Sequence, residues 1–378
     1  MDRRNFLVSA SASLGLAALG LNTQKVEAQQ RGTQTPLITL FMSGGCSAFE
    51  SFNPRTPSSP SNLKGPLSSI QTSIPGVSYS EVFPELARRN SQFSHLRNLN
   101  AGSSDHVDSA RNAFLRGRVN VSETIGDQSS NGGVPYAFLN PNSTWFAVNS
   151  VFHQSNSLAP PYQNGRFVPP TMTVDPQLTE RRRLLEGFES GSQIHSPVAD
   201  RMQRFRETAF DLMQGGGRFA EAFNLPEQER DRYGRNLAGD GMLLARRLVE
   251  RGAGAVTLYF EPTGTSFDLH SGIEEGMKQW APMVDRASSA IIDDITQNRI
   301  DCTFLLTTEF NRTDSINSRG GRDHNSEGNQ AIIAGGKSRK GVVYSNRIDQ
   351  RPNLPNTILS VSGVELPPAE PRIRDIIS

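Results

Sequence analysis

Short apolar runs alternate with helix-like segments in the second half of the chain, and this alternation constrains the fold more than any other feature. Residues 254–260, 302–310 and 330–336 are strand-like runs bounded by glycine or polar residues. Pro282 precedes a helical period, so we expect a helix to begin there, with an apolar face of Val284, Ala287, Ile291 and Ile295. Strands alternating with helices predict an α/β fold with a mostly parallel central sheet flanked by helices.

Two further strands are expected nearer the N-terminus. Residues 35–42 form a buried-strand run that leads into a Gly-Gly turn. Residues 94–102 read as a second strand, followed by a helix over 103–117 with Val107, Ala110 and Phe114 on one face.

The middle of the chain is less regular. Residues 118–175 are rich in Gly, Pro, Asn and Ser, which predicts long loops with one strand at 144–149. Residues 179–250 look helical, with an N-cap at Ser196 before a proline and a further helix over 239–252.

The N-terminus resembles an export signal. Arg3 and Arg4 precede an apolar stretch that runs to Leu21, and a small-residue cleavage site ends at Ala28. We predict a twin-arginine signal peptide over 1–28, the twin-arginine export machinery as a partner, and a periplasmic or otherwise exported mature protein. The alternative is a retained anchor, but the stretch is short and interrupted by serine and glycine.

The mature chain, 29–378, is predicted to be a single domain with a loop-rich and helical insertion at about 118–250. The 39 basic and 38 acidic side chains balance to a net charge of +1, which argues against nucleic acid as a partner. Cys46 and Cys302 are the two cysteines, so at most one disulfide can form.

Polar side chains follow the predicted strands, where ligands bind in parallel sheets. The first strand is followed by Cys46, Ser47, Glu50 and Asn53, and the strand at 94–99 by His106. Asp268 and His270 follow the strand at 254–260. The strand at 302–308 is followed by Glu309 and Arg312 and, further on, by Arg322, Asp323 and His324.

Carboxylate and imidazole together suit a divalent metal ion, with Zn, Mn or Ca as candidates and one or two ions in the site. Such an ion can polarise a phosphoryl or sulfuryl oxygen. The predicted ligands are Asp268, His270, Glu309, Asp323 and His324, together with Glu50 and His106.

Each of these residues also has a structural interpretation. Asp268 could cap a helix that starts near Ser271, and His106 could be a helix-start residue. The remaining alternatives are a loop anchor for Asp323-His324, a salt bridge between Glu309 and Arg312, apolar packing for Cys46, and a turn role for Ser47.

Several motifs occur in a specific order, including "LFMSGGCSAFESFNP", "FDLHSG", "TTEFNRTDSIN" and "GGRDHN". Together they resemble the twin-arginine-exported family known as domain of unknown function 1501, which is related to sulfatases and alkaline phosphatases. The resemblance spans about 36–376 and implies an alkaline-phosphatase-type core with metal ions at the C-terminal edge of the sheet.

The resemblance also assigns positions. It places Asp268 and His270 on the family's tryptophan-Asp-Thr-His motif, Asp323 and His324 on its Gly-Arg-Asp-His motif, and Glu309 and Arg312 on its Glu-Phe-Gly-Arg-Thr motif. This chain departs from the family at Phe267, Asn311 and Asn53, which replace a tryptophan, a glycine and an acid. Cys46 lacks the Cys-x-Pro-x-Arg setting of an ordinary sulfatase.

Two functions follow as hypotheses. The first is an exported metal-dependent hydrolase of phosphate or sulfate esters, with a small anionic ester as substrate. Ser47, Cys46 or a water activated by the ion would attack, and Arg312 or Arg322 would hold the anionic group. The alternative is a non-catalytic exported protein that keeps the fold and binds a ligand or an envelope protein partner.

Overall fold

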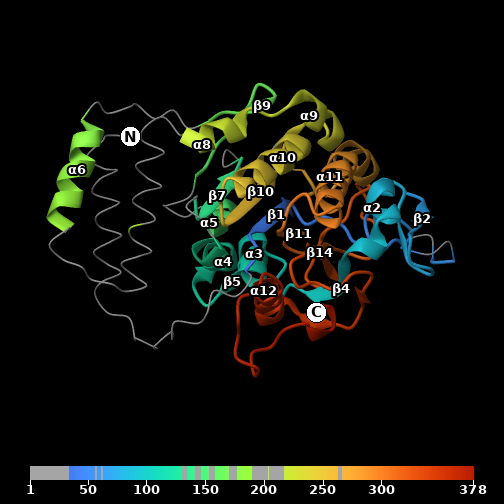
Figure 1. Ribbon diagram of the computed structural model, residues 1–378. Helices are drawn as coiled ribbons and strands as arrows, with labels where there is room; N and C mark the ends of the chain where they lie inside the picture. The colour runs from blue at the N-terminus through green and yellow to red at the C-terminus, as the bar shows by residue number, and fades with distance from the viewer. Residues whose placement is uncertain are drawn as a thin grey trace. The chain divides into compact units, whose positions relative to one another are not determined.

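An eight-stranded sheet forms the centre of the computed structural model (Figure 1). The strand order is β15-β4-β14-β11-β1-β10-β7, and β16 also pairs with β4. The strands are β1 (Leu37–Met42), β4 (Ser94–Asn100), β7 (Tyr136–Leu139), β10 (Ala255–Phe260), β11 (Thr303–Thr307), β14 (Asn329–Gly335), β15 (Val343–Tyr344) and β16 (Ile348–Asp349). Only β14 runs antiparallel to its neighbours, β11 and β4, so the predicted mostly parallel sheet is confirmed.

The structure describes residues 34–55, 58–60, 63–129, 134–140, 146–152, 158–169, 177–189, 203, 217–262 and 266–378. The predicted signal peptide over 1–28 and the predicted helix start at Ser196 lie outside these residues.

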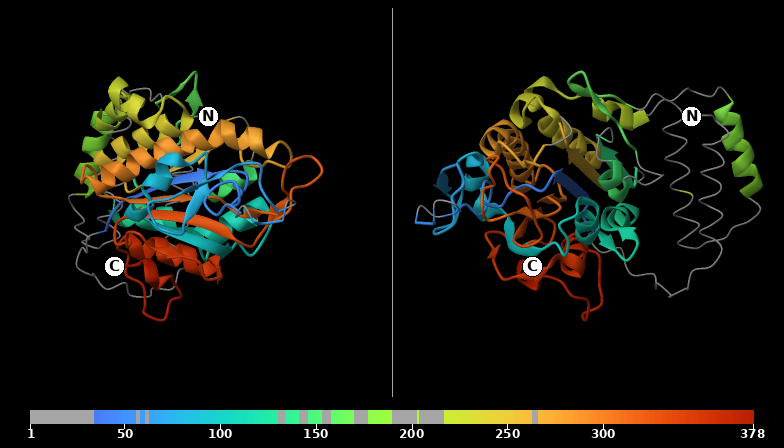
Figure 2. Two further views of the ribbon diagram at one scale, coloured as in Figure 1. Left: turned by 90° about the vertical axis from the view of Figure 1, so that its right-hand side faces the viewer. Right: turned by 180° about the vertical axis from the view of Figure 1, so that it is seen from behind.

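Helices cover both faces of the sheet (Figure 2). The helices that the structure describes are α2 (Pro84–Arg88), α3 (His106–Phe114), α4 (Val121–Ser129), α5 (Phe146–Phe152), α6 (Leu178–Glu189), α8 (Gly217–Ala220), α9 (Glu227–Tyr233), α10 (Leu237–Glu250), α11 (Ile273–Thr296) and α12 (Gln350–Val361), with short 3-10 turns η1 (Asn90–Gln92), η2 (Glu221–Phe223) and η3 (Arg374–Ile376). Two-residue and three-residue ribbons complete the structure: β2–β3 (Ser69–Gln71, Ser78–Ser80), β5–β6 (Leu115–Arg116, Val119–Asn120), β8–β9 (Tyr162–Gln163, Arg166–Phe167) and β12–β13 (Asn311–Arg312, His324–Asn325).

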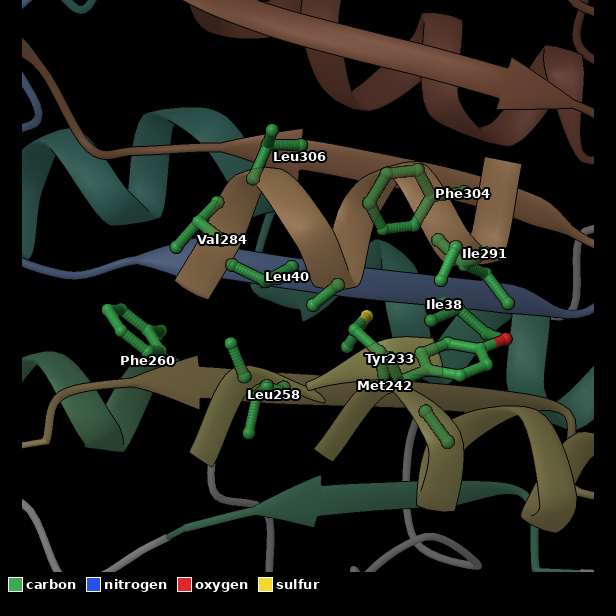
Figure 3. Packing of buried hydrophobic residues seen from close by; sticks show 14 of the residues in the cluster. Ile38, Leu40, Tyr233, Met242, Leu258, Phe260, Val284, Ile291, Phe304 and Leu306 are labelled. Atoms are coloured by element: carbon green, nitrogen blue, oxygen red, sulfur yellow. The ribbon is translucent and has the colours of Figure 1, made fainter. Parts of the chain in front are cut away.

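Strand β1 shows why the sheet needs two helical layers. Its residues are all buried, and successive side chains point to opposite faces. Ile38 and Leu40 join the apolar cluster beneath α10 and α11, whereas Leu37 and Phe41 join the cluster beneath α3, α5 and α12. Figure 3 shows the first of these layers, with side chains of β1, β10 and β11 directed towards helical residues such as Met242, Val284 and Ile291.

Two predicted elements differ from the structure. The described part of the strand predicted at 144–149 is helical, because Phe146–Phe152 is helix α5, whose Val148 and Phe152 are buried in the second cluster. Helix α11 begins at Ile273 rather than at Pro282, which lies inside it. The helix continues through the proline because its buried stripe, which includes Met277, Ala281 and Val284, packs on the sheet.

The stretch at 118–250 contributes to the sheet as well as to helices. Strand β7 lies within it and pairs with β10 at the edge of the sheet. Helix α10 begins at an N-cap, Asn236, whose side chain accepts hydrogen bonds from the amides of Ala238 and Gly239. Among the described residues, no helix is both long enough and apolar enough to span a bilayer.

Candidate metal centre

Four loops bring polar side chains to one edge of the sheet. The loops that follow β1, β10 and β11 share this edge because the three strands are parallel. Strand β4 is parallel to β11, since both are antiparallel to β14, so the loop that leads from β4 to α3 reaches the same edge. His106 is the first residue of α3, and the Asp105 side chain caps that helix by accepting from the amides of Val107 and Asp108.

Three histidines at this edge each use Nδ1 for a hydrogen bond to an oxygen. His106 Nδ1 lies 2.7 Å from Glu309 Oε1, and His270 Nδ1 lies 2.8 Å from Asp323 Oδ1. His324 Nδ1 lies 2.8 Å from the Ser104 carbonyl oxygen, which can only accept. The hydrogen-bond network therefore assigns the proton of each ring to Nδ1, and in the neutral ring this leaves a lone pair on Nε2.

The three Nε2 atoms gather around one carboxylate oxygen. Asp268 Oδ1 lies 3.1 Å from His270 Nε2, 3.2 Å from His324 Nε2 and 3.9 Å from His106 Nε2. The two nitrogens of His270 and His324 are 3.0 Å apart. Ligand atoms of His106, Asp268 and His324 all lie within 4.8 Å of one another. Lone pairs that converge in this way repel each other unless a cation or a proton lies between them.

Arg312 holds Asp268 in place. Its guanidinium donates to Asp268 Oδ1 and to the carbonyl oxygens of Gly44 and Gly45, and its side chain is only 1% exposed. Burial raises the pKa of the Asp268 carboxyl, but the charge and the hydrogen bond of Arg312 lower it, and the pKa lies below its ordinary value. Asp268 is therefore ionised at neutral pH, as a metal ligand would need to be.

Gly44 lets the first loop approach Asp268 closely. Its φ of +106° favours glycine, and a Cβ atom there would lie 2.3 Å from the Asp268 backbone nitrogen. Its amide donates to Glu309 Oε1 at 2.8 Å, the same oxygen that His106 contacts. The glycine after β1 therefore links the loops of β1, β10 and β11.

The predicted site residues fall into two groups. Asp268, His270, Glu309, Asp323, His324 and His106 come together around the centre just described, and Arg312 supports it. Asp268 caps no helix, because Gly272 is the N-cap of α11, and Arg312 pairs with Asp268 rather than with Glu309. Glu50, Arg322 and Ser47 form a second group.

Glu50 is a partner of Arg322 and lies outside the histidine group. Arg322 donates through Nε and Nη2 to the carboxylate, at 2.9 and 2.8 Å, and through Nη1 to the carbonyl oxygens of Thr313 and Asp314. Both side chains are fully buried. These bonds engage all three nitrogens of the guanidinium, so the prediction that Arg322 holds an anionic substrate does not fit the structure.

The two predicted nucleophiles are buried. Ser47 is 2% exposed and donates its hydroxyl to Glu50 Oε2. Cys46 is 4% exposed, and burial raises the pKa of its thiol to about 12, so it is not a thiolate at neutral pH. Cys302 is also a buried free thiol, and no disulfide joins the pair.

Two contributors to the site have no obvious signal in the sequence. Ser104 acts through its backbone carbonyl, which any residue could supply. Asn317 donates to the His270 carbonyl oxygen and to Asp323 Oδ1, and its own oxygen accepts from the amides of Arg319 and Gly321. An asparagine before a Gly-Gly pair is a turn signal, and this turn presents Asp323 to His270.

The fold and the site define an α/β protein with a histidine–carboxylate centre at the C-terminal edge of its sheet. The chain belongs to the family described as Protein of unknown function (DUF1501), whose model matches residues 34–354. No curated protein matches the chain.

Several solved structures match over most of the chain. A putative sulfatase from Bacteroides thetaiotaomicron is 7% identical, with a TM-score of 0.42, over 90% of this chain and 73% of that one. The phosphonate monoester hydrolase SpPMH from Silicibacter pomeroyi is 10% identical, with a TM-score of 0.39, over 90% and 75%. A mutant of TAB5 alkaline phosphatase with Mg bound in its M3 site is 10% identical, with a TM-score of 0.39, over 87% and 99%. At these scores the likeness carries no argument about activity.

Proposed function

We propose that this protein is an exported metal-dependent hydrolase of phosphate or sulfate esters. One observation supports the proposal above all others: three imidazole nitrogens and one ionised carboxylate oxygen converge at the sheet edge. Each of these four side chains is oriented by a hydrogen bond to a second group.

The donor set fits a divalent metal ion. Metal-binding histidines usually donate their second ring nitrogen to a carboxylate or a backbone carbonyl, and His106, His270 and His324 all do so. Three imidazoles and a carboxylate favour zinc or manganese over calcium, which prefers oxygen ligands.

Different neighbouring residues orient different members of the centre. Arg312 and Glu309 are buried and orient Asp268 and His106. The His270 side chain is 34% exposed. An ester would therefore approach the centre from the side on which His270 lies. A divalent ion bound here would polarise an ester oxygen and lower the pKa of a water molecule. Because Ser47 and Cys46 are buried, we propose water as the attacking group.

The burial of Ser47 and Cys46 also supports a second candidate, a non-catalytic protein that keeps the fold and uses the centre to bind a metal or an anionic ligand. If it binds a metal, such a protein would retain the ion without turning over an ester. It would then match the hydrolase in metal content and differ from it in turnover.

Metal analysis of the purified mature protein tests the centre. We expect about one equivalent of zinc or manganese per chain. Replacing a ligand, as in His324→Ala or Asp268→Asn, should remove most of this metal. Asp231→Asn, which removes an exposed carboxylate on α9, is the matched control and should leave the metal content unchanged.

Hydrolysis of para-nitrophenyl phosphate and para-nitrophenyl sulfate tests the reaction. Turnover of either ester that is lost with His324→Ala and retained with Asp231→Asn would support the hydrolase. A folded, metal-loaded protein that is inert towards both esters would favour the non-catalytic candidate. A folded, inert protein without metal would contradict the hydrolase and favour a non-catalytic protein that binds an anionic ligand.

Export by the twin-arginine route is part of the proposal and rests on the sequence of residues 1–28. Fusing these residues to a reporter should direct the reporter out of the cytoplasm. Replacing both Arg3 and Arg4 by lysine should keep it inside. Co-purification of the exported protein with another envelope protein would test the expected partner.

A further inference from the structure

A polar cavity lies beside the ribbon β12–β13, apart from the histidine centre. Its volume is about 400 Å³, which is within the range of small-molecule sites. Asn311 and Asn325 line it and are directly paired in the ribbon, whereas Arg312 and His324, the next pair along, belong to the histidine centre. Neighbouring pairs of a ribbon present their side chains to opposite faces, so the cavity and the centre lie on different sides of it.

A β-bulge in β4 shapes the cavity wall. Leu96 pairs with Ala331 and Leu99 with Asn329, so Arg97 and Asn98 together oppose the single residue Gln330. Asn98 has a φ of +68°, in the left-handed region that asparagine tolerates better than most residues. Bulges redirect side chains, and both bulged residues line the cavity.

Arg97 brings a positive charge that no acid balances. Its Nη2 donates to the carbonyl oxygens of Phe52 and Ser78, and its Nε contacts His95. Nη1 makes no hydrogen bond to the described residues, and none of their carboxylates lies within 4 Å of the guanidinium. Burial lowers the pKa of the Arg97 side chain, as expected for a cation without a counterion.

The other charges around the cavity are already paired. Arg55 and Asp314 form an ion pair at 2.5 Å. The Glu327 carboxylate accepts from Nη2 and Nε of Arg347, at 2.7 and 2.9 Å, and Arg347 does not line the cavity. Among the described residues that line the cavity, Arg97 is therefore the one whose charge is available to pair with a ligand.

The cavity is also rich in hydrogen-bond donors. Arg55 Nε is buried without a hydrogen-bond partner. Asn53 is exposed at the rim, and the Asn325 oxygen accepts from the Glu327 amide, which leaves its NH₂ group for a ligand. Donors around an unbalanced cation suit a ligand with several oxygens and a negative charge.

We propose that this cavity binds a small hydroxylated organic anion, of the size and chemistry of an acidic monosaccharide. Its carboxylate pairs with Arg97, and its hydroxyl oxygens accept from the surrounding amides. Asn53 and Asn311, two positions where the chain departs from the pattern of its family, both line the cavity. The Asn311 side chain holds the cavity wall together, because it accepts from the Ala48 amide and donates to the Glu327 carbonyl oxygen.

Calorimetric titration of the mature protein with sodium D-glucuronate tests this proposal. We expect saturable binding in the micromolar to millimolar range, weaker binding of inorganic sulfate, and no measurable binding of uncharged D-glucose. Arg97→Gln should weaken glucuronate binding by about tenfold or more, since it removes a charge-assisted hydrogen bond. Its metal content should match that of the wild type, because the histidine centre is on the other side of the ribbon.

Two further variants keep the test decisive if Arg97→Gln folds poorly. Asn98→Gly keeps the left-handed backbone and removes the amide that donates to the Ser345 carbonyl oxygen in the cavity wall. It should fold, and the loss of this wall contact should weaken glucuronate binding several-fold. Arg235→Gln removes an exposed positive charge from outside the cavity and should bind normally. Absent glucuronate binding in the wild type, equal binding of glucose, or unchanged binding in both Arg97→Gln and Asn98→Gly would overturn the proposal.

Discussion

At the scale of single residues, the site depends on groups that orient its ligands. Asp323 is the clearest example, since it contacts His270 Nδ1 at 2.8 Å, and that hydrogen bond lowers the pKa of its carboxyl. The ligands themselves follow strands and are recognisable in the sequence. Their orienting partners are harder to predict, because Ser104 contributes only a backbone carbonyl and Asn317 acts through a turn.

Replacing Asp323 by asparagine tests this orienting role. The amide keeps the size of the side chain but removes the charge that fixes the His270 ring, so metal affinity should fall by ~10–100-fold. Competition with a fluorescent zinc chelator measures the affinity. Asp231→Asn again serves as the control, and an affinity equal to that of the wild type would show that Asp323 has no part in the centre.

The buried pair of Glu50 and Arg322 makes a prediction about stability. Arg322→Met leaves a fully buried carboxylate without its partner, so the free energy of unfolding should fall by about 3–5 kcal/mol. The double variant Glu50→Gln/Arg322→Met removes both charges and should recover part of the loss. Urea unfolding measures both values. A double variant less stable than Arg322→Met would contradict this account.

At the scale of elements, the apolar runs at β1, β10, β11 and β14 and the amphipathic helix α10 are predictable, because burial on both faces of a sheet requires continuous apolar sequence. Strand β7 is not, since four residues, Tyr136–Leu139, stand alone in a loop-rich stretch. The aromatic and β-branched residues of helix α5 favour a strand in the sequence, but tertiary packing makes this segment helical.

The close approach of Gly44, in the loop that follows β1, to the Asp268 backbone supports a prediction about packing. Gly44→Ala should lower metal content although Gly44 is not a ligand, because its Cβ would push the Asp268 backbone away. Gly76→Ala is the matched control, with a φ of +77° and no atom within 4 Å of the added Cβ. Both variants should lose about 1–2 kcal/mol from the left-handed backbone. Equal metal content in the two would contradict the role of Gly44.

Helix α11 contributes a pH-sensitive contact. Asp285 accepts from the amides of Glu85 and Leu86 at the start of α2. Burial raises the pKa of its carboxyl to about 7, although these two hydrogen bonds act in the opposite direction. An unfolded aspartate titrates near ~3.9, so the folded protein binds the extra proton between about pH 4 and pH 7.

This contact should make the free energy of unfolding fall as pH rises through that window, because the folded state must release a proton that the unfolded state has already lost. Asp285→Asn cannot titrate, so its stability should decline less between pH 4 and pH 7. Urea unfolding at several pH values compares the two proteins. Identical pH profiles would show that Asp285 does not titrate in this range.

At the scale of the whole molecule, one sheet edge collects residues that are far apart in the sequence. His106, Asp268 and His324 come from three separate stretches, and the shared direction of the strands brings them together. Strand direction follows from the alternation of elements, which is why the gathering of these residues at one sheet edge could be predicted. Glu50 lies in a loop whose path no periodicity specifies, which is why its pairing with Arg322 could not.

Anomalous X-ray diffraction from a crystal of the mature protein, soaked with Zn²⁺ and measured at the zinc edge, tests the central claim most directly. We predict one strong peak within coordination distance of Asp268 Oδ1 and of the Nε2 atoms of His106, His270 and His324, at about 2.0–2.2 Å from each. A peak elsewhere, or well-ordered imidazoles hydrogen-bonded to one another with no ion between them, would contradict the metal centre.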